Sequence, residues 1–245
     1  MATPDSIAGF LLKSVNRAVR DFDLITDGDR IAVGVSGGKD SRTLLDLLMR
    51  GIDIPGAYEV VALHIDGSAV GLPDLNHELE LWFKELGVEY AFSPISVPEK
   101  EPLPMDCFRC SWNRRKTLFY AADTLGCNKI AFGHHADDAT VTTLMSLMTK
   151  AQIETMAPRL DYFDGRFTLI RPLIYVSEIE IKRYVRASGW EISKGPGCQA
   201  GVTSRRAKIE AFLASFSRRE REQIRANLWR TAQTYSAGSV AGDEA

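Results

Sequence analysis

The hexapeptide from Ser36 to Ser41, Ser-Gly-Gly-Lys-Asp-Ser, has the residue types of a phosphate-binding loop. It stands between an apolar run at residues 31–35, typical of a buried strand, and a segment with helical spacing at residues 43–49. Glycine lets backbone N–H groups approach an anion closely, and the N-terminal end of a helix attracts phosphate. The spacing differs from a Walker A loop, because Gly34 and Gly38 enclose one residue too few. The sequence therefore predicts that this loop binds the phosphates of a nucleotide.

Three of the four cysteines stand where they could hold a metal ion or an iron–sulfur cluster. Cys107 and Cys110 form a C-x-x-C motif in a loop punctuated by prolines, and Cys198 lies in a second loop of glycine and proline. Three thiolates do not complete a tetrahedral zinc site, whereas a 4Fe–4S cluster on three cysteines leaves one iron open to a small ligand such as hydrosulfide. Zinc with a further ligand and a thioredoxin-like redox pair remain alternatives. Cys127 has apolar neighbours and is predicted to be a buried thiol.

Histidines and aspartates follow two further predicted strands. The segment Gly133-His134-His135-Ala136-Asp137-Asp138 comes directly after an apolar run at residues 129–132 and precedes a helical pattern. Its two carboxylates could hold Mg²⁺ on a pyrophosphate or cap the helix that follows. His64 and Asp66 stand at the end of the strand predicted at residues 60–65 and could border an adenosine. The predicted contacts to the nucleotide therefore also include Gly133, His134, His64 and Asp66.

Alternating strand and helix patterns position these motifs. Strands are predicted at residues 31–35, 60–65, 90–95 and 129–132, and helices at 6–22, 43–49, 75–86, 114–125 and 139–148. This alternation is typical of an α/β fold with a doubly wound parallel sheet, in which ligands bind at the carboxyl ends of the strands. We divide the chain into an N-terminal helical segment at 1–28, an ATP-binding α/β domain at 29–176, a basic helical region at 177–235 and a flexible tail at 236–245.

The composition bounds the class of protein. The chain has 245 residues, 45% of them apolar, which suits one large domain with appendages. No run approaches the ~18 apolar residues that a membrane span needs, and no basic-then-apolar leader precedes the first helix. These features predict a cytoplasmic protein without a membrane partner, and in that compartment cysteines bind metal or react more often than they form disulfides.

Charge is distributed unevenly along the chain. The formal net charge is −2, but residues 181–235 contain 12 Lys and Arg against 4 Asp and Glu, a local excess of 12 − 4 = +8. Such an excess favours contact with a polyanion, although solvated helices also carry arginines. Aromatic residues that could stack on bases are Trp112, Trp229 and Tyr235, but helical aromatics more often belong to a core.

The order of the motifs resembles the tRNA 2-thiocytidine synthetase (TtcA) family of PP-loop ATP pyrophosphatases. The resemblance rests on Ser36–Ser41, on Cys107 and Cys110 followed by two arginines, on Gly133–Asp138, on Ile170-Arg171-Pro172-Leu173 and on Cys198, and it spans nearly the whole chain. The family usually has a second cysteine near the position of Cys198, and this chain has only the one. The resemblance implies a PP-loop, adenine nucleotide alpha hydrolase-like fold that binds ATP with Mg²⁺ through Ser36, Gly37, Gly38, Asp40 and Ser41. It further implies a 4Fe–4S cluster on Cys107, Cys110 and Cys198, and a homodimer.

The function that follows is ATP-dependent thiolation of a cytidine in the tRNA anticodon loop, with tRNA and a sulfur donor, either a cysteine desulfurase or sulfide, as partners. A pyrimidine C2 oxygen leaves poorly, so the enzyme would first attach AMP to it and then let sulfur displace the AMP. We expect Asp137 to position Mg²⁺ or a proton, and Lys39 and Arg114 to neutralise phosphate charge. The alternatives are a PP-loop sulfurtransferase for another nucleoside or metabolite, an amidating ligase with structural zinc, and a nucleotide-binding redox sensor.

Overall fold

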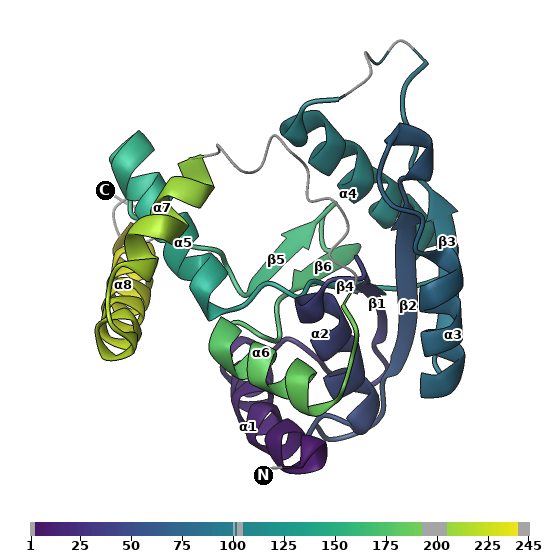
Figure 1. Ribbon diagram of the computed structural model, residues 1–245, viewed down its shortest axis with the longest axis horizontal. Coiled ribbons are helices and arrows are strands. Elements are labelled where there is room, and N and C mark those ends of the chain that lie inside the picture. The colour runs from purple at the N-terminus through teal and green to yellow at the C-terminus, as the bar shows by residue number, and fades with distance from the viewer. Residues whose placement is uncertain (1–2, 100, 102–104, 193–204, 240–245) are drawn as a thin grey trace.

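A computed structural model describes residues 3–99, 101, 105–192 and 205–239 (Figure 1). Its centre is a six-stranded sheet in the order β3-β2-β1-β4-β6-β5. The strands are β1 (Arg30–Gly34), β2 (Glu59–Asp66), β3 (Glu89–Pro94), β4 (Lys129–Ala131), β5 (Arg159–Tyr162) and β6 (Phe167–Ile170). All neighbouring strands pair in parallel except β5, which pairs antiparallel with β6. The predicted α/β fold is confirmed, with the correction that the sheet is mixed at one edge.

Helices cover both faces of this sheet. One face carries α1 (Pro4–Phe22), α2 (Lys39–Arg50), α3 (Asn76–Leu86) and α6 (Glu178–Ala187), whose apolar side chains share one core. The other face carries α4 (Cys107–Thr124), which packs through Leu118 and Ala122 on a second core. The N-terminal helix follows its predicted amphipathic spacing, because Leu11, Val15 and Ala18 are fully buried in the first core.

Helix α4 begins earlier than the sequence indicated. The prediction left the C-x-x-C motif in a loop and began the helix at residue 114, but Cys107 is the first residue of the helix. Asp106 causes this early start, since its side chain accepts a hydrogen bond of 2.7 Å from the backbone N–H of Arg109 and caps the helix. The cysteine motif therefore forms the first turn of α4.

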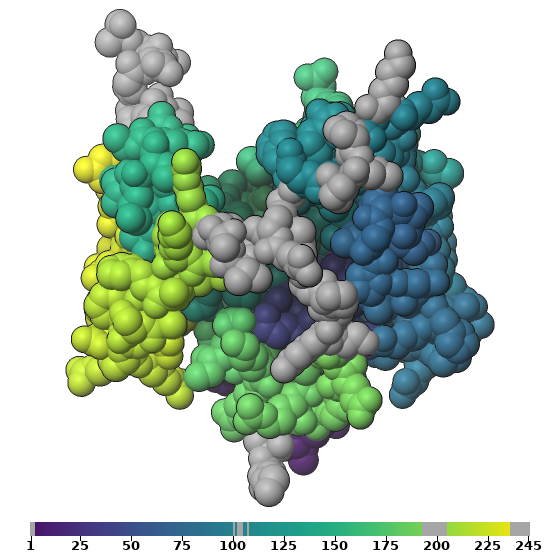
Figure 2. Space-filling model, turned by 45° about the horizontal axis from the view of Figure 1, so that its top comes forward, coloured from purple at the N-terminus to yellow at the C-terminus, as the bar shows by residue number. Residues whose placement is uncertain are grey.

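A helical lobe stands beside the carboxyl ends of the strands (Figure 1). Helix α5 (Ala136–Lys150) leaves the sheet after β4 and packs against α7 (Arg205–Ala214) and α8 (Arg218–Ser239). Val141 of α5 is buried with Ile209 and Leu213 of α7 in a small core of their own. Figure 2 shows the surface hollowed between this lobe and the teal segment on the right that contains α4. Within the described ranges, no helix has the length and apolar character to cross a membrane.

Candidate active site

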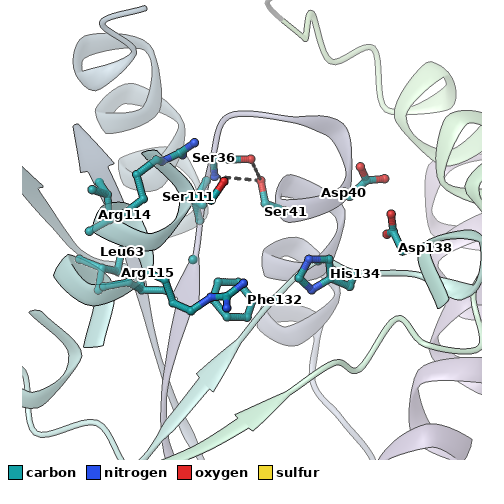
Figure 3. A pocket seen from close by; sticks show the side chains of 15 residues that line it. Ser36, Asp40, Ser41, Leu63, Ser111, Arg114, Arg115, Phe132, His134 and Asp138 are labelled. Carbon is teal, nitrogen blue, oxygen red and sulfur yellow. Dashed lines mark hydrogen bonds between the residues drawn. The ribbon is translucent and has the colours of Figure 1, made fainter. Parts of the chain in front are cut away.

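A cavity of about 370 Å³ opens at the carboxyl ends of β1, β2 and β4. Helix α4 borders it on one side, and the N-terminal turns of α2 and α5 border it on the other (Figure 3). We call the first side the α4 wall, formed by Ser111, Arg114, Arg115 and Leu118. We call the second side the phosphate wall, formed by Ser36, Asp40, Ser41, Gly133, His134 and Asp138. The floor between them is apolar and includes Val35, Leu63, Ile65 and Phe132.

The phosphate wall is built from a helix that begins without a side-chain cap. Gly38 is the N-cap of α2 and has no side chain to satisfy the first backbone N–H groups, so these remain free to bind an anion. Ser41 instead fixes the preceding loop: its Oγ accepts from the Ser36 backbone N–H at 3.1 Å and lies 3.3 Å from Ser36 Oγ (Figure 3). These contacts hold the loop in a shape that presents its donors to a phosphate group.

Arg42 anchors the same loop from behind. Its guanidinium is buried, donates from Nε to the Gly37 carbonyl at 3.1 Å and forms an ion pair with Glu78 of α3. Gly37 has a φ of +81°, a backbone conformation that side chains rarely adopt. The paired glycines therefore serve the turn that the sequence predicted, and Arg42 is a positioning residue that the sequence analysis did not identify.

Gly133 brings the two helix N-termini of this wall together. A Cβ built on Gly133 would lie 2.8 Å from the backbone of Asp40 and of Ser41. Because backbone atoms cannot swing aside as a flexible side chain can, no larger residue fits here without moving α2 or β4. Glycine is thus required at residue 133 by close approach.

His134 presents a hydrogen-bond donor to the cavity. Arg171, the residue after β6, donates from Nε to His134 Nδ1 at 3.3 Å, so Nδ1 accepts and the ring proton is assigned to Nε2. Burial, together with the positive charge of Arg171, lowers the pKa of His134 to about 4. His134 is therefore neutral near pH 7 and can donate to a phosphate oxygen. The Arg171 motif had no predicted role, and the sequence does not reveal this contact because the two residues lie far apart in the chain.

Two carboxylates of the phosphate wall can hold a cation. Asp40 Oδ1 is buried and has no hydrogen-bond partner among the described residues, although its Oδ2 pairs with Lys39 at 2.9 Å. Asp138 also lines the cavity, while its Oδ2 accepts from the His135 backbone N–H at 2.9 Å and caps α5. Asp138 therefore caps a helix and faces the ligand, and its Oδ1 forms an ion pair with Arg206 of α7. Oxygen donors of this kind fit Mg²⁺, and Asp40 Oδ1, which accepts no hydrogen bond among the described residues and lies 3.6 Å from His135 Nε2, is the better placed of the two carboxylates.

The α4 wall is cationic. Arg114 and Arg115 extend from α4 on the side of the cavity opposite Asp40 and Asp138 (Figure 3). In the part of the chain that the structure describes, neither guanidinium has an ion pair. Unpaired guanidinium groups suit negative phosphate charge. Arg114 thus lines the cavity, and its role in neutralising phosphate charge stays a prediction. Arg115, the second of the two arginines on which the resemblance rests, lines the same wall, as does Ser111, which the sequence analysis did not single out.

The first turn of α4 continues this wall toward the predicted cluster. Residues 107 and 110 are spaced to lie on one side of the helix, and Arg114 follows Cys110 on the same side about 6 Å further along the axis. Cys110 is a half-buried free thiol. A helix N-terminus stabilises thiolates, which are the ligands of an iron–sulfur cluster, so the two positions fit that group. Cys198 lies outside the described residues. Cys127 is a buried free thiol, as predicted.

Several predicted residues lie outside the cavity lining. Side chains alternate along β2, so Leu63 and Ile65 face the cavity, while His64 and Asp66 do not line it. His64 is buried, with Nδ1 2.7 Å from the Val35 carbonyl, and burial lowers its pKa. Asp66 accepts from the Ser68 backbone at 2.8 Å. Both side chains shape the ends of β1 and β2.

Asp137 and Lys39, the other two predicted catalytic residues, make their contacts near the start of α6. Asp137 Oδ2 accepts from the Glu178 backbone N–H at 2.7 Å, at the start of α6. Lys39 pairs with Asp40 and with Glu178, and these pairs raise its pKa although burial opposes them. Gly37 and Gly38 likewise belong to the loop without lining the cavity. Among the described residues, no three His, Cys, Asp or Glu side chains are grouped as a metal site.

Comparisons with known proteins identify the family of this chain. A tRNA-cytidine(32) 2-sulfurtransferase of Anaeromyxobacter dehalogenans (strain 2CP-C) is 38% identical over 227 residues, which cover 89% of this chain and 76% of the relative. The chain belongs to the tRNA-cytidine(32) 2-sulfurtransferase family. The relative of that family from Pseudomonas fluorescens (strain Pf0-1) is 35% identical over 218 residues, covering 85% of this chain and 78% of the relative. No protein-family model matches the chain.

A solved structure supports the same fold. The U34-tRNA thiolase NcsA from Methanococcus maripaludis, solved with its [4Fe-4S] cluster, superposes with a TM-score of 0.69 at 21% identity, covering 92% of this chain and 80% of that one. This likeness shows that the chain shares the fold of that protein. The resemblance predicted from the motifs is thus confirmed at the level of family and fold.

Proposed function

We propose that this protein is an ATP-dependent tRNA sulfurtransferase that replaces the C2 oxygen of cytidine 32 with sulfur. The observation that carries the proposal is that one cavity lies between the phosphate loop and α4. Helix α4 contributes both the arginines that line this cavity and the C-x-x-C pair. A nucleotide held by the phosphate wall would therefore have its phosphates beside the cysteines. Family membership supports the choice of tRNA cytidine as substrate.

The phosphate wall would act in the first half-reaction. The C2 oxygen of the base attacks the α-phosphorus of ATP, pyrophosphate leaves, and the base carries AMP on that oxygen. Backbone N–H groups of α2 and the Nε2–H of His134 would donate to the departing pyrophosphate. Asp40, assisted by Asp138, would hold Mg²⁺ on the same phosphates. Arg114 would offset the charge that develops on the α-phosphate side.

Sulfur enters in the second half-reaction. Hydrosulfide attacks C2, the C2–O bond breaks and AMP leaves with the former base oxygen, so that a C2–S bond replaces it. Cys107, Cys110 and Cys198 would hold a 4Fe–4S cluster, which when bound would supply the sulfide for this step. Arg114 and Arg115 would retain AMP until the sulfur has attacked. The sulfur donor and the homodimeric state stay predictions.

The experiment compares the wild type with Cys110→Ala and Cys127→Ala, all purified without oxygen. Iron and sulfide content are measured first, and nucleosides of tRNA incubated with ATP and sulfide are then analysed by mass spectrometry. We expect Cys110→Ala to lose the cluster and to thiolate about a hundredfold less, while its affinity for ATP stays unchanged. Cys127→Ala should keep both, because that thiol lies in the core under α4. Stoichiometric zinc without sulfide in the wild type, or thiolation by Cys110→Ala at the wild-type rate, contradicts the proposal. A thiolated uridine in place of cytidine would assign the other nucleoside.

A further inference from the structure

A second cavity lies on the outer side of α4. It has a volume of about 390 Å³ and is formed by α4 and by the hairpin of β5 and β6. Six aromatic side chains line it: Trp112, Phe119, Tyr120, Tyr162, Phe163 and Phe167. Its basic side chains are Arg115, Lys116 and Arg166, against the single carboxylate of Asp123. We call this cavity the aromatic cleft.

The aromatic cleft has a packed base and an open rim. Phe119 forms the base, since its ring centroid lies 5.2 Å from that of Tyr162 and 5.8 Å from that of Phe167. The rim is exposed: 49% of Trp112, 62% of Tyr120 and 63% of Phe163 is accessible to solvent. Large aromatic side chains are normally buried, so a cluster of exposed ones on a rigid base indicates a binding surface.

The hairpin turn holds Phe163 in an uncommon conformation. Phe163 has a φ of +54° and Asp164 a φ of +55°, and the Arg166 backbone N–H closes the turn on the Phe163 carbonyl at 3.1 Å. A positive φ is rare for a bulky residue, and such backbone strain gathers at functional sites. The turn presents the Phe163 ring to solvent beside α4, where a ligand can reach it.

Charge decides which ligand fits. Lys116 Nζ lies 5.5 Å from the ring centre of Trp112 and 5.7 Å from that of Tyr120, so its charge stands among the exposed rings. Lys116 and Arg115 have no ion pair within the described ranges, whereas Arg166 pairs with Asp123 at 2.6 Å. Free cations between exposed aromatic faces match a ligand with flat rings and a negative backbone, which is single-stranded nucleic acid.

Arg115 connects the aromatic cleft to the active site, because it lines both cavities. We propose that the aromatic cleft binds unstacked bases of the RNA substrate next to the nucleotide that is modified. The proposal rests on the proposed function for the identity of the RNA as tRNA. Trp112, Tyr120 and Phe163 stack on the bases, and Lys116 contacts the phosphates between them. The stretch of loop next to the target base is thereby held on one side of α4 while that base enters the cavity on the other.

The test measures binding of the cluster-containing full-length protein to an anticodon stem–loop RNA and to a duplex of the same stem without a loop. Trp112→Ala and Phe163→Ala should each weaken binding of the stem–loop about tenfold and leave binding of the duplex unchanged, because stacking needs unpaired bases. Phe10→Ala removes an aromatic ring of similar exposure, 57%, from α1 and should alter neither. A fluorescent base analogue in the loop should be quenched by the wild type and not by Trp112→Ala.

Three results would overturn the assignment. The first is an unchanged affinity of both variants for the stem–loop, with the base analogue still quenched by Trp112→Ala. The second is a loss of affinity in the variants that is equal for the stem–loop and the duplex. The third is intact RNA binding by Trp112→Ala with loss of sulfur delivery from a cysteine desulfurase but not from inorganic sulfide, which would assign the cleft to a protein. Thiolation of tRNA by the wild type is measured in the same samples. Stem–loop binding that depends on Trp112 without any thiolation would refute the proposed function alone.

Discussion

The two walls of the active-site cavity are built in opposite ways. The phosphate wall is fixed within the folded chain. Ser41 accepts a hydrogen bond from the Ser36 backbone, Arg171 donates one to His134, and Gly133 leaves no room for a side chain against the backbone of α2. The α4 wall presents arginines that have no ion pair in the described part of the chain. The first wall is preorganised for one ligand group, whereas the second gains its partners only when substrates bind. We therefore expect damage to the first wall to alter the fold of the site, and damage to the second to alter chemistry alone.

The largest effect should come from Gly133→Ala. The added Cβ would press on the backbone of Asp40 and Ser41, so α2 must shift and its N–H groups lose their alignment. Thiolation should fall about a hundredfold, and the free energy of unfolding should fall by about 1–3 kcal/mol. Thiolation assays and thermal unfolding measure these two quantities, and titration with ATP measures the affinity of the loop for the nucleotide. Gly9→Ala is the matched control, because nothing lies within 4 Å of its added Cβ in α1, and its stability should stay equal or rise. Wild-type ATP affinity in Gly133→Ala would show that the phosphate wall is not preorganised.

Arg114→Ala tests the other side of the comparison. The side chain has no ion pair among the described residues, so its removal should leave the free energy of unfolding within about 0.5 kcal/mol of the wild type. The rate of thiolation should fall about tenfold to a hundredfold, because the charge on the α-phosphate loses a donor. Single-turnover kinetics separate this loss from ATP binding. A variant that unfolds more readily and retains its rate would place Arg114 among the structural residues.

Asp40→Asn sharpens the comparison within the phosphate wall. The substitution keeps the shape of a side chain whose buried Oδ1 accepts no hydrogen bond among the described residues, but it removes the charge that attracts Mg²⁺. The concentration of Mg²⁺ needed for half-maximal ATP consumption should rise about tenfold. Asp137→Asn is measured beside it, since the sequence pointed to Asp137 as the catalytic carboxylate. A shift in Asp137→Asn and none in Asp40→Asn would assign the metal to the α6 side of the loop.

The smallest effect is the pH dependence that His134 gives to the free energy of unfolding. Its pKa is lowered to about 4, and the charged groups that act on it are Arg171, Asp138, Arg206 and Arg115. The unfolded chain takes up this proton below pH ~6.5, whereas the folded chain takes it up only near pH 4, so stability falls as the pH falls through that window. His134→Asn should show a shallower fall between the same limits in denaturant titrations. An identical slope would mean that His134 is not buried in its neutral form.

The contrast between the walls also explains what the sequence could predict. The phosphate loop was recognisable because paired glycines indicate a turn with a positive φ, which Gly37 adopts. Gly133 was recognisable as part of a second loop because it directly follows a predicted strand. The alternation along β2 was missed by one residue, so His64 and Asp66 were chosen in place of Leu63 and Ile65, which face the cavity. Strands β5 and β6 were not predicted, because they follow one another in an antiparallel hairpin that departs from the alternation of strand and helix.

Contacts between residues that are distant in the sequence could not be predicted from it. Arg171 meets His134, and Arg42 meets Glu78, across separations that no local pattern encodes. Asp106 was the one local signal that was overlooked, since an N-cap aspartate before the C-x-x-C pair would have put both cysteines in a helix. The family, by contrast, could be identified from the sequence, because the order of the motifs along the chain can be read without knowing any contact between them.

The most direct test of the account follows the oxygen that the base loses. A tRNA substrate carrying a heavy oxygen isotope at C2 of cytidine 32 is incubated with the cluster-containing protein, ATP and sulfide, and the AMP released is analysed by mass spectrometry. If the phosphate wall holds ATP while the base oxygen attacks the α-phosphorus, each AMP formed with a 2-thiocytidine carries the heavy oxygen. Formation of 2-thiocytidine with unlabelled AMP, or with ADP and phosphate, would contradict adenylation and with it the role assigned to both walls.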